Sequence, residues 1–482
     1  MRKILLIALQ GISLFVMFFL LILQDKLPDG FKLYTLMPLS FFVGTFFLYK
    51  NFFSTSMRFL LTNIGILIMF FLRMVLSPLF SALSGWYFEA AYAPMIENNL
   101  SLAILLISYE CFISFLFLGL ISKPKVINQT EKYDLKLIGN NLFYIVFILF
   151  GIIVFLLWGR NGLVSFGILT SDIGERIGDN TNQFLNLVIQ IIKITCTLLF
   201  LLLLSLLQKS YTQKKSFKLV LFAIILAVLN TSVIVGERRT IMLFTAISSF
   251  LLIIVVFKKY RNQILLWGIL STLILLGLAS FYKSYLANQF GSYSDAISNT
   301  TFTLSDISQD LQAYFTGPQN VSIAILTRRS HSPNFLNLLY DFARSFFGFN
   351  FLVKDRDMSL TSELFNNVFY SSNNYKSGHI LSSIGFGYYY FGAILAPIFT
   401  IFHIKLSTII EKILNKSRSY ESLYFWSYIL SRVIFNIYYS TPSMIIFITQ
   451  NMFTLGLVFL IGSLISRKGK ANINTDENYN LL

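Results

Sequence analysis

Long apolar runs alternate with short polar connections along the whole chain. Each run is about 20 residues long, the length that a helix needs to cross a hydrocarbon core of ~30 Å. The runs are continuous and do not alternate in polarity, so the pattern favours membrane helices over a membrane β-barrel. Twelve spans are predicted, over residues 4–24, 34–49, 59–79, 100–121, 137–158, 184–207, 219–235, 240–257, 263–282, 381–402, 421–438 and 443–465.

The positions of the basic residues orient these spans. Positive charge collects in cytoplasmic loops of membrane proteins. With Arg2 and Lys3 inside, every even-numbered connection and the C-terminal tail carry Lys or Arg. Twelve spans with both termini in the cytoplasm therefore satisfy the rule. No small-x-small cleavage site follows the first apolar run, so we expect a retained first span and not a removed signal peptide.

The ninth connection, residues 283–380, is much longer than the others. Structureless connections longer than ~15 residues are uncommon, so we expect helices within it. Phe335, Leu338, Leu339 and Phe342 follow the spacing i, i+3, i+4 and i+7, which predicts an amphipathic helix lying on the membrane surface. The predicted organisation is spans one to nine in 1–282, an extracytoplasmic segment in 283–380, spans ten to twelve in 381–466 and a cytoplasmic tail in 467–482.

Composition supports a polytopic all-α membrane protein. Hydrophobic residues make up 55% of the chain and charged residues 12%, whereas soluble domains carry roughly 25% charge. The net charge of +16 lies mostly in short loops, where it orients spans and does not indicate nucleic acid. The sequence has no P-loop, no Rossmann glycine fingerprint and no Cys/His metal spacing, so we expect neither a cofactor nor a metal.

Lysine and arginine are distributed differently across the predicted membrane. The inner connections and ends hold 17 Lys and 5 Arg, whereas the outer connections hold 5 Lys and 8 Arg. Lysine is a compact point charge, but the planar guanidinium fork of arginine matches phosphate and carboxylate groups. The excess of arginine outside therefore predicts a site for an anionic substrate on that face.

The turn Gly236–Thr240 carries two of these arginines, Arg238 and Arg239, between consecutive spans. Gly236 permits a tight turn that holds both cations at the outer membrane boundary. The alternative is that they snorkel to lipid headgroups. Four more arginines of the outer connections are candidates for binding the anion, with solvated surface charge as the alternative: Arg160, Arg176, Arg328 and Arg329.

Three cations fall inside predicted spans: Arg73, Lys193 and Arg432. Charge within the membrane is costly and usually functional, so we expect all three to line a cavity open to the outside. The alternative is that they form internal ion pairs.

Two residues of the large outer segment are candidate general bases. His379 begins the return into the membrane, and Glu363 precedes an aromatic, Asn-rich stretch. The alternatives are a plain interfacial histidine and a solvated carboxylate. The tyrosines at 388–390 either belong to an interfacial belt or stack on sugar rings.

Together these features resemble the Wzy-type O-antigen and capsular polysaccharide polymerases of bacteria and the related O-antigen ligases. The resemblance covers the architecture of the whole chain: about twelve spans, one large outer loop and outer arginines. More specifically it involves the turn Gly236–Thr240 and the stretch from His379 to Gly392. Ligases carry a His-led motif with a later glycine at this boundary, which the glycines at 385, 387 and 392 match in part.

The resemblance implies a GT-C-like fold and a bacterial inner-membrane glycosyltransferase. Such polymerases join oligosaccharide repeat units carried on undecaprenyl pyrophosphate, at the outer face of the plasma membrane, beside a flippase and a chain-length regulator. The outer arginines would then stabilise charge developing on the pyrophosphate. His379 or Glu363 would be the base for the acceptor hydroxyl.

Other functions remain open from the sequence. An O-antigen ligase shares the donor and the fold. Another polyprenyl-dependent glycosyltransferase would use an acidic residue in the first outer loop, where Asp25 and Asp29 lie. A lipid-linked oligosaccharide flippase also has many spans and interior cations, but it would have short outer loops. A secondary transporter would show an internal repeat, which we do not find.

Overall fold

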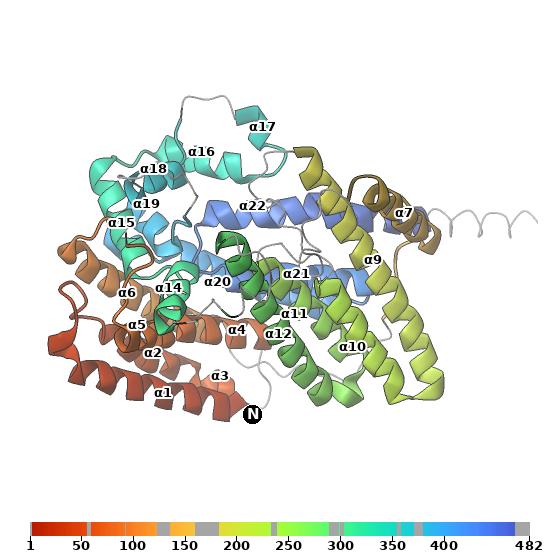
Figure 1. The fold of residues 1–482 in the computed structure, drawn as a ribbon, viewed down its shortest axis with the longest axis horizontal. Helices are drawn as coiled ribbons and strands as arrows, with labels where there is room; N and C mark the ends of the chain where they lie inside the picture. The colour runs from red at the N-terminus through yellow and green to blue at the C-terminus, as the bar shows by residue number, and fades with distance from the viewer. Residues whose placement is uncertain are drawn as a thin grey trace, which may run out of the picture. The chain divides into compact units, whose positions relative to one another are not determined.

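The structure is a computed structural model of the chain (Figure 1). It describes residues 2–54, 59–91, 93–122, 135–159, 183–232, 239–288, 298, 303–353, 358–370 and 379–467. Within these residues every regular element is a helix, as the sequence predicts. The chain divides into two compact units, of which unit 1 comprises 1–130, 302–412 and 432–450, and unit 2 comprises 131–301, 413–431 and 451–482.

The two units use different sets of helices. Unit 1 contains α1 (Arg2–Ile22), α2 (Leu36–Thr45), α3 (Tyr49–Phe53), α4 (Leu60–Phe71), α5 (Ser77–Ser84), α6 (Glu97–Ile121), α14 (Leu304–Tyr314), α15 (Pro318–Ser330), α16 (Phe335–Ser345), α17 (Asn350–Val353), α18 (Thr361–Phe369) and α19 (Ser383–Leu395). Unit 2 contains α7 (Asn141–Val154), α9 (Gln183–Lys214), α10 (Phe217–Ser232), α11 (Arg239–Val256) and α12 (Arg261–Asn288). Residues of both units occur in α20 (Ile398–Lys416), α21 (Tyr420–Phe435) and α22 (Thr441–Asn451).

The apolar helices indicate a multi-pass membrane protein associated with a lipid bilayer. Within the described residues, seven helices are long and apolar enough to cross a membrane, and there are up to nine spans if each of two bent pairs counts as one. The sequence predicts twelve. The difference arises because α10 and α21 have only 16 residues each, and because α11 and α12 form one of the bent pairs, with an angle of 115°.

The predicted span 381–402 is not one continuous helix. It is divided into α19 and α20, whose axes differ by 109°. Gly392 has a φ of +75° inside α19, a conformation that interrupts the helix. Pro397 lies in the break and has no N–H to continue the hydrogen-bond ladder. A broken helix of this kind is tolerated at membrane depth only where other parts of the protein surround it.

In unit 1, connections that the sequence places on the same side of the membrane are in contact. Ser308, in the ninth connection, donates a hydrogen bond to the carbonyl oxygen of Trp86 in the third connection (2.7 Å). The other end of the helix formed by α4 and α5 is in contact with a predicted cytoplasmic connection. There Glu411, in the predicted tenth connection, accepts from the N–H groups of Leu61 (3.0 Å) and Thr62 (2.8 Å) at the start of the third predicted span. Which end faces the cytoplasm stays a prediction.

A buried ion pair lies inside unit 1. Arg73, in a π-helical segment (Leu72–Leu76) between α4 and α5, donates from Nη1 to Glu110 Oε2 of α6 at 2.6 Å. Arg73 is 1% exposed and Glu110 is fully buried. The guanidinium also donates to the carbonyl oxygen of Thr316 and lies over the ring of Tyr438. Each charge is therefore paired, which is the condition under which ions are tolerated away from water.

The ion pair is connected to α20 and α19 through hydroxyl groups. Thr400 of α20 donates to the second carboxylate oxygen of Glu110. Its hydroxyl also lies 2.9 Å from that of Ser383, the first residue of α19. The network therefore fixes the start of α19, four residues after His379 in the chain.

After the end of α12, the described part of the ninth connection forms helices α14 to α18. Of the predicted apolar face of α16, Leu338 and Phe342 pack into a core cluster, whereas Phe335 (66% exposed) and Leu339 (51% exposed) point outward. The exposed apolar surface continues after α16 through Phe346, Phe349, Phe351 and Leu352. This is the distribution expected of a helix at a membrane surface, a location that stays a prediction.

In unit 2, α10 packs against α9, α11 and α12. Glu421 of α21 fixes the segment before α7, because its carboxylate accepts from the N–H groups of Ile138 and Gly139 at 2.9 Å each. The hydroxyl of Tyr144 donates to the same oxygen at 3.3 Å.

We expect single replacements within the ion pair to destabilise the protein more than a double replacement. Arg73→Met leaves Glu110 as an unpaired buried charge, with a cost of about 3–5 kcal/mol in the free energy of unfolding, and Glu110→Leu has the converse effect. The double variant removes both charges and should recover most of the loss. Thermal unfolding in detergent measures this. A double variant less stable than either single variant would contradict the ion-pair explanation.

Candidate functional site

His379 and Glu89 form a hydrogen-bonded pair, which we call the dyad. Nδ1 of His379 lies 2.8 Å from Oε1 of Glu89. Glu89 follows α5 in the third connection, and His379 precedes α19 at the end of the ninth. The two connections predicted to lie outside therefore contribute one residue each to the dyad.

Two neighbouring side-chain amides at the start of α15, those of Gln319 and Asn320, bind the chain segments that carry Glu89 and His379. Gln319 accepts from the N–H groups of Glu89 (2.8 Å) and Ala90 (3.0 Å). Asn320 donates to Oε2 of Glu89 at 3.3 Å and to the carbonyl oxygen of Ile380 at 2.9 Å. The two amides therefore bind both chain segments, which come together although they are far apart in sequence.

Helix α18 supports the imidazole from another direction. The ring of Phe369 stacks on that of His379, with 3.8 Å between the ring centroids and 24° between the planes. Asn366, one turn earlier, accepts from the backbone N–H of His379 at 2.8 Å. Figure 1 shows α15, α18 and α19 close together, in agreement with the contacts of α15 with both α18 and α19. The orientation of the imidazole is thus determined by three elements.

The environment of the dyad suits proton transfer. The side chain of Glu89 is 2% exposed, whereas that of His379 is 21% exposed. Burial raises the pKa of Glu89 above its ordinary value, and the hydrogen bond from His379 opposes this rise. With Nδ1 turned to Glu89, Nε2 is the ring nitrogen that would exchange a proton with a substrate. The arrangement of a buried carboxylate behind a partly exposed histidine is that of an oriented general base.

The carboxylate paired with His379 is Glu89, whereas Glu363, the alternative candidate base, lies elsewhere, on α18. Glu363 is exposed in the first turn of α18. Its Oε2 accepts from the N–H of Leu360 at 2.9 Å, which satisfies a donor at the start of the helix. In this structure Glu363 therefore stabilises the end of a helix that supports His379.

Arg328 and Arg329 have different surroundings, and their predicted role in binding a phosphate stays a prediction. Nη1 of Arg328 donates to the carbonyl oxygens of Tyr388 and Tyr389, and the guanidinium lies over the ring of Tyr388. These carbonyls belong to the part of α19 before its interruption at Gly392. Arg328 therefore stabilises the broken helix, while Arg329 is exposed at the end of α15.

The cations predicted inside spans have different surroundings. Arg73 lies buried in the ion pair with Glu110, the alternative considered above. Arg432 is 7% exposed, with its guanidinium carbon 4.0 Å from the ring centroid of Phe447. Lys193 lines a cavity of about 60 Å³ in unit 2, together with polar groups that include Asn230 and Tyr424.

Three candidate arginines, Arg160, Arg176 and Arg238, lie outside the described residues. Arg239 is the first residue of α11, but its side chain is also outside the described part. Their role in binding an anion stays a prediction. In the part of the chain that the structure describes, no group of three or more His, Cys, Asp or Glu residues is placed to hold a metal ion.

Sequence reasoning missed Glu89, Gln319 and Asn320. Glu89 is one of two acidic residues in a connection without Lys or Arg, which is a weak signal for a special role. The two amides give no signal in one sequence, because their role depends on which distant segments they join. Comparisons with protein-family models, curated proteins and solved structures found no match for this chain.

We expect Glu89→Ala to lower the free energy of unfolding by about 2 kcal/mol, because it removes the acceptor for His379 and Asn320 at a buried position. Glu97→Ala is the matched control, since Glu97 is exposed at the start of α6 and should change stability by less than about 0.5 kcal/mol. Thermal unfolding of both variants in one detergent checks this. Equal effects would show that the dyad does not hold the two connections together.

Proposed function

We propose that the protein is a glycosyltransferase of GT-C-like architecture that polymerises oligosaccharide repeat units carried on undecaprenyl pyrophosphate. The product would be O-antigen or capsular polysaccharide. The observation that carries the proposal is the dyad, an oriented histidine base on two connections predicted to lie outside the membrane. An acceptor hydroxyl needs such a base, while the lipid pyrophosphate donor already supplies the energy and no nucleotide is required.

In this mechanism an acceptor hydroxyl oxygen forms a bond to the anomeric carbon of the donor sugar, and Nε2 of His379 takes the hydroxyl proton. The bond between the anomeric carbon and the pyrophosphate oxygen breaks, and the electron pair leaves with undecaprenyl pyrophosphate. Glu89 orients the imidazole and stabilises its positive charge. Arg238 and Arg239 would stabilise the negative charge on the leaving group. A single displacement of this kind inverts the anomeric carbon.

The proposal places the protein in the bacterial inner membrane, with twelve spans and both termini in the cytoplasm. A flippase would deliver the lipid-linked units, and a chain-length regulator would act on the product. A flippase function for this chain itself is less well supported, because moving a lipid-linked sugar requires no base. The acidic residues of the first outer connection give little support to another transferase, since Asp29 forms an exposed ion pair with Lys32 (3.0 Å).

An O-antigen ligase is the second candidate, because the dyad would serve its acceptor hydroxyl equally well. The acceptor distinguishes the two enzymes. A polymerase transfers the growing chain to another lipid-linked unit, whereas a ligase transfers finished polymer from the lipid.

Lipid-linked glycans of cells that lack the protein test the proposal. We expect single repeat units to accumulate on the lipid and long polymer to be lost. Long polymer retained on its lipid would identify a ligase instead, and units held on the cytoplasmic face would identify a flippase. Complementation with His379→Ala should give less than ~1% of normal polymer, because general base catalysis contributes ~10²–10⁴-fold. His331→Ala, a change to another histidine of the same outer segment, should complement.

Arg238→Ala and Arg239→Ala should each abolish polymer while leaving the protein in the membrane. Replacing both with Lys should restore activity only in part, because lysine lacks the bidentate fork of arginine. Polymer length on gels and protein amount on membrane blots measure these outcomes. Normal polymer in both alanine variants would exclude an anion site at this turn, and full rescue by lysine would reduce its role to simple charge.

A further inference from the structure

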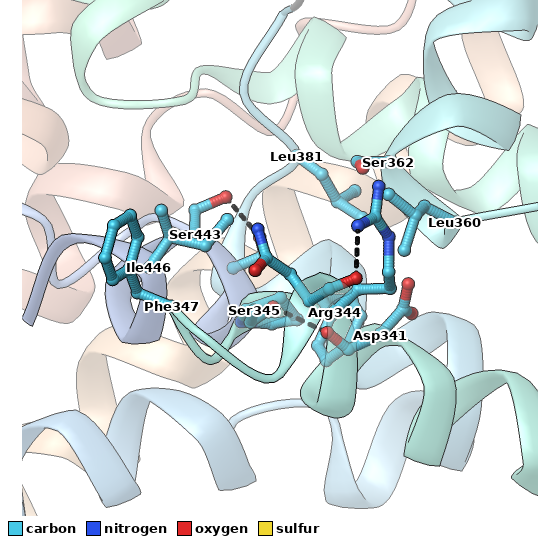
Figure 2. A pocket seen from close by; sticks show the side chains of 13 residues that line it. Asp341, Arg344, Ser345, Phe347, Leu360, Ser362, Leu381, Ser443 and Ile446 are labelled. Atoms are coloured by element: carbon cyan, nitrogen blue, oxygen red, sulfur yellow. Dashed lines mark hydrogen bonds between the residues drawn. The ribbon is translucent and has the colours of Figure 1, made fainter. Parts of the chain in front are cut away.

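Unit 1 contains a cavity of about 230 Å³ that the mechanism above does not use. Residues of α16, the first turn of α18, the segment before α19 and the first turn of α22 line it. Figure 2 shows that Asp341 and Arg344 come from the same helix, with the guanidinium extending toward Ser362 and Leu381. Phe347 and Ser443 are among the other lining residues.

Asp341 is a buried acceptor in this wall. It is 2% exposed, and its carboxylate accepts from the N–H of Thr361 (3.0 Å) and the hydroxyl of Tyr390 (2.8 Å). Burial raises its pKa above the ordinary value, although these two hydrogen bonds oppose the rise. The contacts fix the carboxylate between α16, α18 and α19, so its position does not depend on a ligand.

Two other polar atoms of the lining residues have no hydrogen-bond partner among the described residues. They are Nε of Arg344, which is a donor, and Oδ1 of Asn350, which is an acceptor. Nη1 of Arg344 already donates to the carbonyl oxygen of Asn350 at 3.0 Å, so the two residues are held together. Unpartnered buried polar atoms are costly and call for an explanation. A hydroxyl group both accepts and donates, so a ligand rich in hydroxyls can satisfy both atoms.

The other lining groups favour a single sugar ring. The volume corresponds to roughly eight water molecules at ~30 Å³ each, which suits one small polar ring and not an oligosaccharide. Ser345, Ser362, Ser440 and Ser443 add hydroxyl groups, while Phe347 and Phe386 provide apolar surface. A phosphate would be repelled by the fixed carboxylate of Asp341, whereas sugar hydroxyls can donate to it.

The cavity lies close to the dyad along two elements of the fold. Ser362 lines the cavity, and Asn366, which binds the backbone of His379, follows four residues later on α18, a rise of about 6 Å. Leu381 also lines the cavity, two residues after His379, or about 7 Å in an extended chain. Both separations are close to the length of one sugar residue.

From these observations we infer that the cavity binds one monosaccharide residue of the acceptor, with Asp341 and Arg344 as the recognition groups. The inference rests on the proposed glycosyltransferase function. According to this inference, the sugar ring bound in the cavity carries the acceptor hydroxyl that reaches His379. The cavity would therefore select the acceptor sugar.

Direct binding tests the inference without requiring activity. The full-length protein in lipid nanodiscs is mixed with the monosaccharides released by complete acid hydrolysis of the cell's own envelope polysaccharide. Saturation-transfer NMR then reports which sugar binds, and titration with that sugar gives its Kd. We expect one sugar to bind to the wild type, and Arg344→Met to weaken its binding at least tenfold.

Ser443→Leu fills the cavity while leaving both recognition groups in place, and it should also abolish binding. Ser332→Leu is the matched control on an exposed residue outside the cavity and should bind like the wild type. Thermal unfolding of each variant shows that it is folded.

The assignment of the cavity is overturned if the wild type binds no sugar, or if Ser443→Leu leaves binding unaffected. This holds even if deletion cells accumulate single repeat units, as the polymerase proposal predicts. Binding that depends on Arg344 and Ser443, in a protein whose deletion leaves lipid-linked glycans unchanged, supports a sugar site and overturns the polymerase.

Discussion

The ion pair between Arg73 and Glu110 is the interaction on which unit 1 depends. In a lipid environment an ionised side chain needs a partner within the protein, so the two helices that carry these residues must stay in contact. The guanidinium also binds the carbonyl oxygen of Thr316, just before the amides of α15 that hold one half of the dyad. The carboxylate reaches Ser383 through a hydroxyl of α20, just after the other half. One buried pair of charges therefore fixes the positions from which both connections reach the dyad.

The arginines of the described chain show a second use for the guanidinium group. Arg73 and Arg328 both donate to backbone carbonyl oxygens where a helix begins, ends or is interrupted. A helix end leaves carbonyls without N–H partners, and these are costly where water is absent. Arginine has five donors in a fixed plane, whereas lysine has three on a flexible stem. Arg328 is one of the arginines on the predicted outer side, so binding to irregular backbone accounts for part of their excess. The anion site proposed at the Gly236–Thr240 turn does not need all of these arginines.

Much of the fold could be predicted from the sequence, because a membrane span is encoded by the length and composition of one continuous apolar run. The break in the predicted span 381–402 is also encoded locally, by Gly392 and Pro397. The residues around them are apolar, so hydrophobicity alone predicts one continuous span. His379 was identified as a candidate because of its place at a predicted membrane boundary. Glu89 and the partner of Arg73 were not, since pairing depends on how helices pack, and one sequence carries no record of which residues vary together. Glu363 has the right chemistry for a base, but its carboxylate is used at a helix end.

The sequence separations within the ion pair and within the dyad have a consequence for the order in which the chain is assembled. Arg73 and Glu110 are 37 positions apart, whereas Glu89 and His379 are 290 apart. At a synthesis rate of ~5–20 residues per second, the ion pair can form within roughly 2–7 seconds, but Glu89 waits roughly 15–60 seconds for its histidine. During that time its carboxylate has no imidazole partner and must stay hydrated or protonated. The dyad is therefore a late product of biogenesis, added to a framework of helices that is already in the membrane.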